Sequence, residues 1–455
     1  MNTKAINTKE QVHSLISDSK SSHVKVGVFD LDGVLCGKYM SKDKFLSSLD
    51  SGFGFCEVVL GWDVNDKLYD SAKLTGWHTG YGDAQVKILP ELYRTLPFED
   101  DTPMVIGEFT GRLSSLCPRG VLRKVLDRAE SMGFKVKAAC EYEFLVLDES
   151  IEALRAKEFK APKTLGEGNF GYSMLRNSVN TDFYKGLLDL CNEMEIPLEG
   201  LHEETGPGML EAAITVDDAL NSADKAALFK TFAKVFAQRQ GRTLSFMAKW
   251  NEQYSGQGGH VHLSLTDLDG KPLFHDAEKP NGISDTMRWF IGGLQRLVPE
   301  FAGLVTPTIN SYRRLVPGYW APTTATWGVD NRTVAIRAIS GSAKSQRVEY
   351  RVPGADANPY LALAGALAAG LWGIENRIEP LTPIEGNGYE QETPDELKLP
   401  RTLWESAQRL RNSTVAKEWL GESFIEHYTT SREWEEREFA RHVTDWELNR
   451  YLEII

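Results

Sequence analysis

The chain has little cysteine, and the cysteines it has form no recognisable pattern. Its 455 residues include five, with no C-x-x-C pair among them: Cys36, Cys56, Cys117, Cys140 and Cys191. A scattered, odd-numbered set predicts reduced and mostly buried thiols, and it excludes a cysteine-based zinc site. We therefore expect a cytoplasmic protein without structural disulfides.

Long apolar runs and an excess of positive charge are also lacking. The most apolar stretch, residues 360–374, is too short to span a bilayer and predicts a buried helix. Residues 1–16 have no apolar core typical of a signal peptide. Acidic residues outnumber Lys and Arg by 64 to 51, for a net charge of −13, which argues against nucleic acid or an anionic membrane as partner. The remaining composition is that of a soluble globular protein with room for two or three domains.

Against this acidic background, arginines gather in one part of the chain. Six of them lie within about forty residues: Arg313, Arg314, Arg332, Arg337, Arg347 and Arg351. Guanidinium groups bind carboxylate and phosphate oxygens in a planar, two-pronged way, so the cluster favours a small anionic ligand. Residues 333–337 and 347–351 alternate as strands do. On the second of these strands, Glu349 shares one face with Arg347 and Arg351 and lies between them. That carboxylate is either part of a structural ion pair or a metal ligand beside an anion site.

Two more carboxylates alternate along an expected strand at residues 135–148. Glu141 and Glu143 share one face and lie about 7 Å apart, so they repel each other unless a cation lies between them. The alternative is a solvent-facing strand edge. Because Leu145 and Leu147 continue the same face, this face is not simply hydrated.

A third pair of carboxylates flanks a turn. In residues 202–214, HEETGPGMLEAAI, a Gly-Pro-Gly turn can bring Glu204 and Glu211 toward one point. Glutamates beside turns are more often simply exposed to solvent, so this signal is weak by itself.

Residues 246–265 predict a strand, a glycine loop and a second strand. On the second strand, His260 and His262 share one face with Ser264. Histidines two residues apart on a strand are either metal ligands or part of a polar sheet face. The remaining periodicity predicts helices at 121–132, 217–240, 402–411 and 431–452.

A competing signature lies near the N-terminus. Asp-Leu-Asp-Gly at residues 30–33 follows an expected strand at 24–29, and it is similar to the signature of haloacid-dehalogenase phosphatases. The alternating strands and helices of such a fold do not follow. We therefore interpret the segment as a structural turn and keep the phosphatase as an alternative from a different enzyme class.

Several long blocks carry a family resemblance: NSYRRLVPGY, DNRTVAIR and QRVEYRVPGADANPYLALAGALAAGL. They resemble the glutamine synthetase superfamily, and especially its glutamate–amine ligase branch of the γ-glutamylpolyamine synthetase type. The resemblance covers nearly the whole chain. It implies an α+β fold with a small N-terminal β-grasp domain (residues 1–112) and a large catalytic domain (113–455) built on a curved antiparallel sheet with flanking helices. It also implies a homo-oligomer, a dodecamer of two hexameric rings.

The resemblance also implies a role for each candidate residue. Two to three Mg²⁺ or Mn²⁺ ions would have six ligands, namely Glu143, Glu204 and Glu211 on one side and Glu141, His260 and Glu349 on the other. ATP would contact His262, Ser264, Arg332, Arg337 and Arg347, and L-glutamate would contact Gly256, Arg314 and Arg351. Arg332 and Arg337 would also neutralise charge during catalysis. Asp83 would reach a neighbouring subunit's site on the loop 77–83 and bind or deprotonate the amine; the alternative is a turn aspartate that caps its own loop.

One departure from the family pattern bears on the substrate. Ammonia-using glutamine synthetases have a glutamate after V-P-G-Y, where this chain has Trp320. An indole cannot pair with ammonium but can pack against an organic amine, and Trp77 and Tyr81 would add to an aromatic pocket. We therefore expect ATP-dependent ligation of an organic amine to the γ-carboxylate of glutamate, through γ-glutamyl phosphate. The alternatives are an ammonia-using glutamine synthetase and a non-catalytic homologue.

Overall fold

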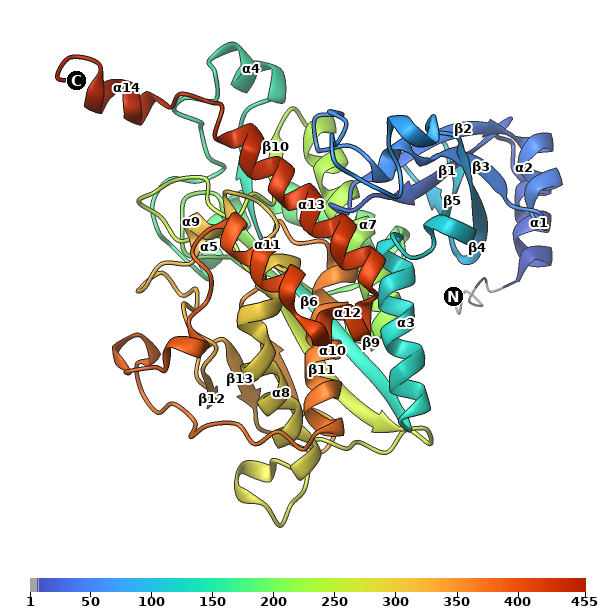
Figure 1. Cartoon of the computed structure of the whole chain (residues 1–455). Coiled ribbons are helices and arrows are strands. Elements are labelled where there is room, and N and C mark those ends of the chain that lie inside the picture. Colours follow the sequence, from blue (N-terminus) through green and yellow to red (C-terminus); the bar gives the residue numbers. More distant parts are fainter. Residues whose placement is uncertain (1–5, 7) are drawn as a thin grey trace.

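The structure is a computed structural model that describes residue 6 and residues 8–455. Its strands form two separate sheets (Figure 1). The smaller sheet has the order β2-β1-β5-β4-β3, with β1 and β5 parallel and the other neighbours antiparallel. Its elements are β1 (His23–Phe29), β2 (Leu35–Ser41), β3 (Phe53–Cys56), β4 (Asp83–Leu96) and β5 (Thr102–Phe109), accompanied by α1 (Lys9–Asp18) and α2 (Lys42–Ser48).

The larger sheet has nine strands, seven of them in the path β12-β13-β14-β11-β6-β8-β7. Neighbours are antiparallel except β12 and β13, and the short strands β9 and β10 also pair with β6. The strands are β6 (Phe134–Leu147), β7 (Leu198–Glu203), β8 (Met209–Ile214), β9 (Asp217–Asp218), β10 (Thr243–Ser245), β11 (Gly259–Asp267), β12 (Trp327–Val329), β13 (Ile336–Ile339) and β14 (Arg347–Tyr350). The expected α+β class is therefore confirmed, whereas the name β-grasp and the division after residue 112 stay predictions.

Helices cover one face of the larger sheet (Figure 1). From residue 118 onward the α-helices are α3 (Pro118–Ser131), α4 (Ile151–Ala156), α5 (Met174–Val179), α6 (Thr181–Glu193), α7 (Ala219–Arg239), α8 (Asp285–Phe301), α9 (Ser311–Arg314), α10 (Pro359–Glu375), α11 (Leu403–Asn412), α12 (Thr414–Leu420), α13 (Glu422–Phe439) and α14 (Asp445–Tyr451). The buried helix expected at 360–374 is α10, which packs against α8, α3 and α7. Gly373 of α10 and Gly293 of α8 permit the close contact between these two helices, since a Cβ on Gly373 would lie 2.5 Å from the Cα of Gly293. Within the described part of the chain, no helix has the length and apolarity needed to cross a bilayer.

Three sequence-based boundaries were wrong. The strand expected at 333–337 begins only at Ile336, because the Asn331 side chain accepts hydrogen bonds from the Thr333 backbone N (2.9 Å) and hydroxyl (2.7 Å) and holds a turn there. The strand expected to begin at residue 246 lies earlier, as β10, and residues 246–258 form a loop.

The helix expected at 431–452 is two helices. The first, α13, begins nine residues earlier than predicted, at Glu422, and ends at Phe439. The second, α14, begins after Thr444, whose side chain accepts a hydrogen bond from the Glu447 backbone N while Glu447 reaches back to the Thr444 backbone N. This capping box starts a new helix, which a continuous helical pattern does not reveal.

The Asp-Leu-Asp-Gly segment is the turn that joins β1 to β2. Asp30 accepts hydrogen bonds from the backbone N of Asp32 (2.9 Å) and Val34 (2.8 Å), and Gly33 has a φ of 77°, which favours glycine. β2 returns antiparallel to β1 directly after the turn. The interpretation as a structural turn is confirmed, and this hairpin lacks the strand-to-helix connection that the phosphatase alternative requires.

Candidate active site

A cavity of about 330 Å³ opens on the face of the larger sheet that the helices leave free. On β6, Tyr142 and Phe144 pack against Phe229 of α7, so the alternating Glu141 and Glu143 point to the opposite face, as the sequence predicts. The cavity is lined by Glu141, Glu143, Tyr172, Glu204, Thr205, Met209, Glu211, Ser255, Gly256, His260, Arg314, Tyr319, Trp320, Arg332 and Arg351.

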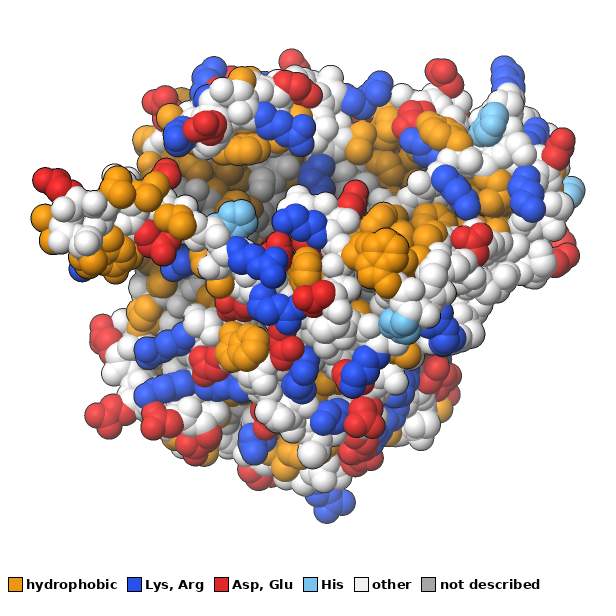
Figure 2. Space-filling view, turned by 45° about the horizontal axis from the view of Figure 1, so that its top comes forward, with side chains coloured by type: hydrophobic (Ala, Val, Ile, Leu, Met, Phe, Trp, Pro, Cys, Tyr) orange, Lys and Arg blue, Asp and Glu red, His pale blue; other side chains and the backbone are white. Residues whose placement is uncertain are grey.

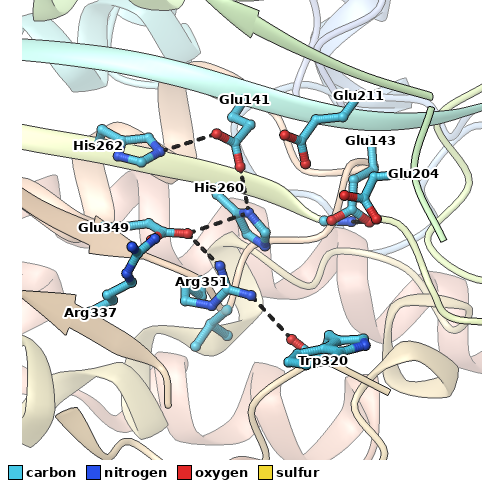
Figure 3. Close-up of polar contacts among 12 residues, drawn as sticks. Glu141, Glu143, Glu204, Glu211, His260, His262, Trp320, Arg337, Glu349 and Arg351 are labelled. Atoms are coloured by element: carbon cyan, nitrogen blue, oxygen red, sulfur yellow. Dashed lines mark hydrogen bonds and ion pairs between the residues drawn. The ribbon is translucent and has the colours of Figure 1, made fainter. Parts of the chain in front are cut away.

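The register of the sheet brings the polar side chains together (Figure 3). Glu143 lies directly opposite Glu211 on β8, and Glu141 lies directly opposite His260 on β11. Further along the sheet, Glu349 on β14 lies directly opposite His262 of β11 on one side and Arg337 of β13 on the other. A row of opposed pairs therefore crosses five neighbouring strands, and a slip of one residue in any strand would remove its members from this face.

In this region, two sets of three side chains could each hold a metal ion, because the ligand atoms within each set all lie within 4.8 Å of one another. One consists of Glu141, His262 and Glu349, and the other of His202, Glu204 and Glu211. This grouping differs from the predicted division, because His202 was not identified from the sequence and His262 was assigned to ATP. His202 lies near the end of β7, two residues before Glu204, which follows the strand, and this spacing of two is the signal that could have identified it.

His260 lies between the two groups. Its Nδ1 is 3.0 Å from Glu141 Oε1 and 3.7 Å from Glu349 Oε1, and its Nε2 is buried without a hydrogen-bond partner among the described residues. A buried, unpartnered imidazole nitrogen beside several carboxylates fits a divalent cation. The donor set, mostly carboxylate oxygens with few imidazoles, suits Mg²⁺ or Mn²⁺.

The carboxylates repel one another strongly. Burial and the charges of Glu141 and Glu143 raise the pKa of Glu211 to about 10. The pKa of Glu143 is raised as well, chiefly by burial. Glu349 is different: burial acts to raise its pKa, but Arg351 and His260 lower it to about 2. Without a cation, the carboxyl groups of Glu211 and Glu143 therefore hold their protons more strongly than usual, and a bound cation would favour their charged forms instead.

Three of the predicted arginines, Arg314, Arg332 and Arg351, line this cavity, and a fourth, Arg337, contacts Glu349. Arg314 is buried and donates hydrogen bonds to the carbonyls of Val352 (2.9 Å) and Arg351 (3.2 Å). Arg351 pairs with Glu349, which also accepts a hydrogen bond from Arg337 at 2.9 Å. Arg332 is exposed at the edge of the cavity.

Gly256 lies against Arg314 in the cavity wall. A Cβ at this position would lie 2.6 Å from Arg314 Cγ and 2.7 Å from the Ala248 carbonyl oxygen, so a side chain would displace the arginine.

A second cavity, of about 420 Å³, lies on the other side of Glu141. His262, Ser264 and Arg347 line it together, and Arg347 Nε lies 3.2 Å from His262 Nδ1. Glu141 belongs to the walls of both cavities. The residues predicted to contact ATP and those predicted to contact glutamate thus fall mainly on opposite sides of one carboxylate.

Aromatic side chains form the outer rim of the first cavity. Trp320 is 55% exposed and has a φ of 60°, and Tyr319 precedes it. Tyr172, which also lines this cavity, stacks on His202 with ring centroids 4.6 Å apart. Neither tyrosine was singled out in the sequence.

The loop at 77–83 lies elsewhere. Among the described residues, the lining of the first cavity includes none of Trp77, Tyr81 and Asp83. Trp77 is 77% exposed and packs edge-to-face on Tyr81, with ring centroids 5.6 Å apart. Within one chain, therefore, these aromatic side chains do not enlarge the aromatic rim.

Charge on the visible surface is mixed. Figure 2 shows basic and acidic side chains interspersed over this face, without a broad basic area. This distribution agrees with the net charge of −13.

Comparisons with known proteins cover almost the whole chain. The profile of a family described as "Glutamine synthetase, catalytic domain" matches residues 115–451. The chain is 45% identical over 459 residues to the type-1 glutamine synthetase 2 of Dictyostelium discoideum, which covers 100% of this chain and 88% of that protein. It is 38% identical over 452 residues to a glutamate–isopropylamine ligase of Pseudomonas sp, covering 98% of each.

Another relative and a solved structure extend these findings. The gamma-glutamylethanolamide synthetase of Streptomyces coelicolor is 36% identical over 448 residues, covering 98% of this chain and 95% of that one. The structure described as "Apo GmaS without ligand" superposes with a TM-score of 0.84 at 26% identity, covering 97% of this chain and 99% of that one.

Proposed function

Because this chain belongs to the glutamine synthetase family, we propose that it joins an organic amine to the γ-carboxylate of L-glutamate at the expense of ATP. A ligation reaction of the glutamine synthetase type follows from the family itself, whose enzymes use ATP and divalent metal ions. The choice of an organic amine is the further step. It rests on one observation, the indole of Trp320 at the rim of the cavity.

The residues present fit the metal ions that the reaction needs. Bound there, Mg²⁺ or Mn²⁺ would neutralise the negative charge of the phosphate groups during transfer. The side chains available to hold them are Glu141, Glu143, His202, Glu204, Glu211, His260 and Glu349. We keep Glu143 and His260 in this set because both line the same cavity.

The arginines divide between the two substrates. Arg314 and Arg351 lie side by side in the wall of the first cavity and would hold the carboxylates of glutamate. Arg332 and Arg337 would face the γ-phosphate and stabilise the charge that develops during transfer, while Arg347 and His262 would contact the other phosphates. An oxygen of the γ-carboxylate attacks the γ-phosphorus of ATP, and ADP leaves with the bridging oxygen. An uncharged amine then attacks the carbonyl carbon of γ-glutamyl phosphate, and phosphate leaves as the amide forms and the amine loses a proton.

The rim would bind the amine. An indole offers an apolar surface to carbon substituents and a π-face to an alkylammonium group, but it has no carboxylate to bind ammonium itself. Two of the relatives are named a glutamate–isopropylamine ligase and a gamma-glutamylethanolamide synthetase, and each name contains an organic amine or its amide. Both facts support an organic amine for this chain.

Ammonia is the alternative substrate, since the relative at 45% identity is named a glutamine synthetase. ADP release should be measured with glutamate and, in turn, ammonia, methylamine, isopropylamine, ethanolamine, aniline and putrescine, and each product identified by mass spectrometry. We expect a γ-glutamylamide of an organic amine to form fastest. Fastest turnover with ammonia would contradict the proposal, and the absence of ADP release with every amine would favour a non-catalytic homologue.

The assembly belongs to the proposal too. Asp83 is exposed at the start of β4, directly after the loop and outside the lining of its own cavity, so its proposed role requires a neighbouring chain. We therefore propose a homo-oligomer, a dodecamer of two hexameric rings, in which this loop completes the adjacent site.

A further inference from the structure

The hairpin turn at residues 30–33 is attached to the larger part of the molecule at two points. Asn358, which precedes α10, donates a side-chain hydrogen bond to the Leu31 carbonyl at 3.0 Å. Asp32 forms an ion pair of 2.8 Å with Arg432 of α13, and the side chains of the pair are only 15% and 4% exposed. The turn therefore does more than connect two strands.

Arg432 joins this turn to a third segment. Its Nη1, which pairs with Asp32, also donates a hydrogen bond of 2.8 Å to the Pro307 carbonyl, and its Nε donates to the Ser431 hydroxyl. A buried guanidinium is costly unless its charge is paired and its donors are satisfied. Asp32 supplies the charge that keeps Arg432 in contact with Pro307.

Pro307 begins the segment that ends in Arg314. Within this segment, Thr308 and Ser311 both donate hydrogen bonds to Asp356 Oδ2, at 2.9 and 2.6 Å. Arg314 in turn donates to the Val352 and Arg351 carbonyls. Residues 307–314 and 351–358 are thus bound to each other at both ends.

The two attachments of the turn meet these same two segments. Arg432 carries the contact from Asp32 to residues 307–314, and Asn358 carries the contact from Leu31 to residues 351–358. Both segments end in the cavity wall, where Arg314 and Arg351 lie.

From this chain of contacts we infer that Asp32 is a positioning residue, which acts through Arg432 to hold Arg314 in the cavity. The inference rests on the proposed function, because there Arg314 holds a carboxylate of glutamate. Loss of the Asp32 charge leaves Arg432 buried and unpaired, so its contact with Pro307 weakens and the Arg314 segment shifts. ATP would bind on the other side of Glu141, so its affinity is independent of this shift.

The test compares Asp32→Asn with a matched control, Glu108→Gln. Glu108 is likewise a buried carboxylate of the smaller sheet, and it pairs with Arg119 of α3 at 2.9 Å. Its further partners, Arg123 and Lys87, lie outside residues 307–314 and 351–358. In the purified full-length protein, thermal unfolding, the KM values for glutamate and ATP, and the calorimetric Kd for glutamate are measured for both variants.

We expect Asp32→Asn to raise the KM and Kd for glutamate at least tenfold, since a shift of about 1 Å in a positioning group can cost on the order of 100-fold. The KM for ATP stays at the wild-type value. Glu108→Gln lowers the melting temperature but leaves the KM for glutamate unchanged. If Asp32→Asn does not fold, Asn358→Ser tests the second attachment with the same expectations, because serine can still cap α10.

Each outcome is informative. A folded Asp32→Asn with wild-type affinity for glutamate, or an equal rise in KM in Glu108→Gln, would overturn the positioning role and leave the proposed function intact. A wild-type protein that binds no glutamate in calorimetry would instead overturn the proposed function together with the inference that rests on it.

Discussion

The floor and the rim of the cavity are built in different ways. The floor consists of side chains on neighbouring strands, where Glu143 faces Glu211 and Glu141 faces His260 in direct register. The rim consists of Tyr172 and Trp320 in connecting segments, both with φ near 60° and both more than half exposed. The register of the sheet sets the positions of the floor side chains, whereas the rim side chains lie in segments outside the sheet. The floor is therefore suited to chemistry shared by a family, and the rim to the choice of substrate.

The largest effect should come from the floor. We expect Glu143→Gln to lower kcat by on the order of a thousandfold, because a metal ligand contributes several kcal/mol to charge stabilisation. The fold should remain, since the amide oxygen of Gln can still accept the hydrogen bond that Glu143 accepts from the Gly258 backbone N at 2.8 Å. The measurement is kcat with saturating Mg²⁺, together with the melting temperature with and without Mg²⁺.

A substitution outside the site serves as the control for that variant. Glu252→Gln removes an exposed carboxylate from the loop before β11 and should leave both kcat and the Mg²⁺-induced rise in melting temperature unchanged. Normal turnover of a folded Glu143→Gln would show that Glu143 is not a metal ligand.

The second effect concerns the rim. Burial of three or four carbons of an amine contributes about 2–3 kcal/mol, or on the order of a hundredfold in kcat/KM over ammonia. Trp320→Glu should reverse this preference, since it removes the apolar wall and adds a carboxylate that binds ammonium. The measurement is kcat/KM for ammonia and for the best organic amine in both proteins.

Trp320→Gln is the matched control for that change. It removes the indole without adding charge, so it should weaken the organic amine and leave ammonia at its wild-type rate. If the ratio of the two amines is the same in wild type, Trp320→Glu and Trp320→Gln, the rim does not select the amine.

The same comparison explains what could be predicted from the sequence. The floor follows from period-two alternation: the shared face of Glu141 and Glu143 and the pairing of Glu349 with Arg351 are as predicted. The second arginine that pairs with Glu349 is Arg337 on the neighbouring strand, whereas Arg347 contacts His262 instead. Alternation within one strand cannot give the register between strands, which is why the grouping of His202 and His262 with the carboxylates was not foreseen.

The rim could not be predicted in this way. Tyr172 reaches the cavity from a connecting segment by stacking on His202, a contact between residues thirty positions apart that no local pattern encodes. Trp320 was identified only because the family resemblance gave its position a meaning. The predicted turn at 30–33 was found, but its attachment to Asn358 and Arg432 depends on the packing of distant segments.

We expect each active site to need residues from two neighbouring chains. Asp83→Ala and Arg314→Ala should each be inactive alone. In mixed oligomers assembled from equal amounts, about a quarter of heterologous interfaces combine two intact halves, so activity should partly return. Wild-type chains diluted with Arg314→Ala chains provide the reference for mixing efficiency. Persistent inactivity in verified mixed oligomers would exclude shared sites.

The smallest effect should come from Tyr172, which belongs to the rim but contacts the floor through His202. An aromatic pair of this kind contributes about 0.5–1.5 kcal/mol, so Tyr172→Ala should reduce kcat/KM by only about 2–10-fold. The two regions then predict different patterns. If Tyr172 acts by holding His202 against Glu204 and Glu211, kcat/KM falls equally for ammonia and for the organic amine, and the Mg²⁺ concentration required for half-maximal rate rises. If Tyr172 acts as a second wall for the amine, kcat/KM falls only for the organic amine and the Mg²⁺ requirement is unchanged.

Tyr172→Phe, which keeps the ring and removes the hydroxyl, should match wild type in either case. A loss in Tyr172→Phe as large as in Tyr172→Ala would mean that the hydroxyl, and not the stacked ring, is the functional group.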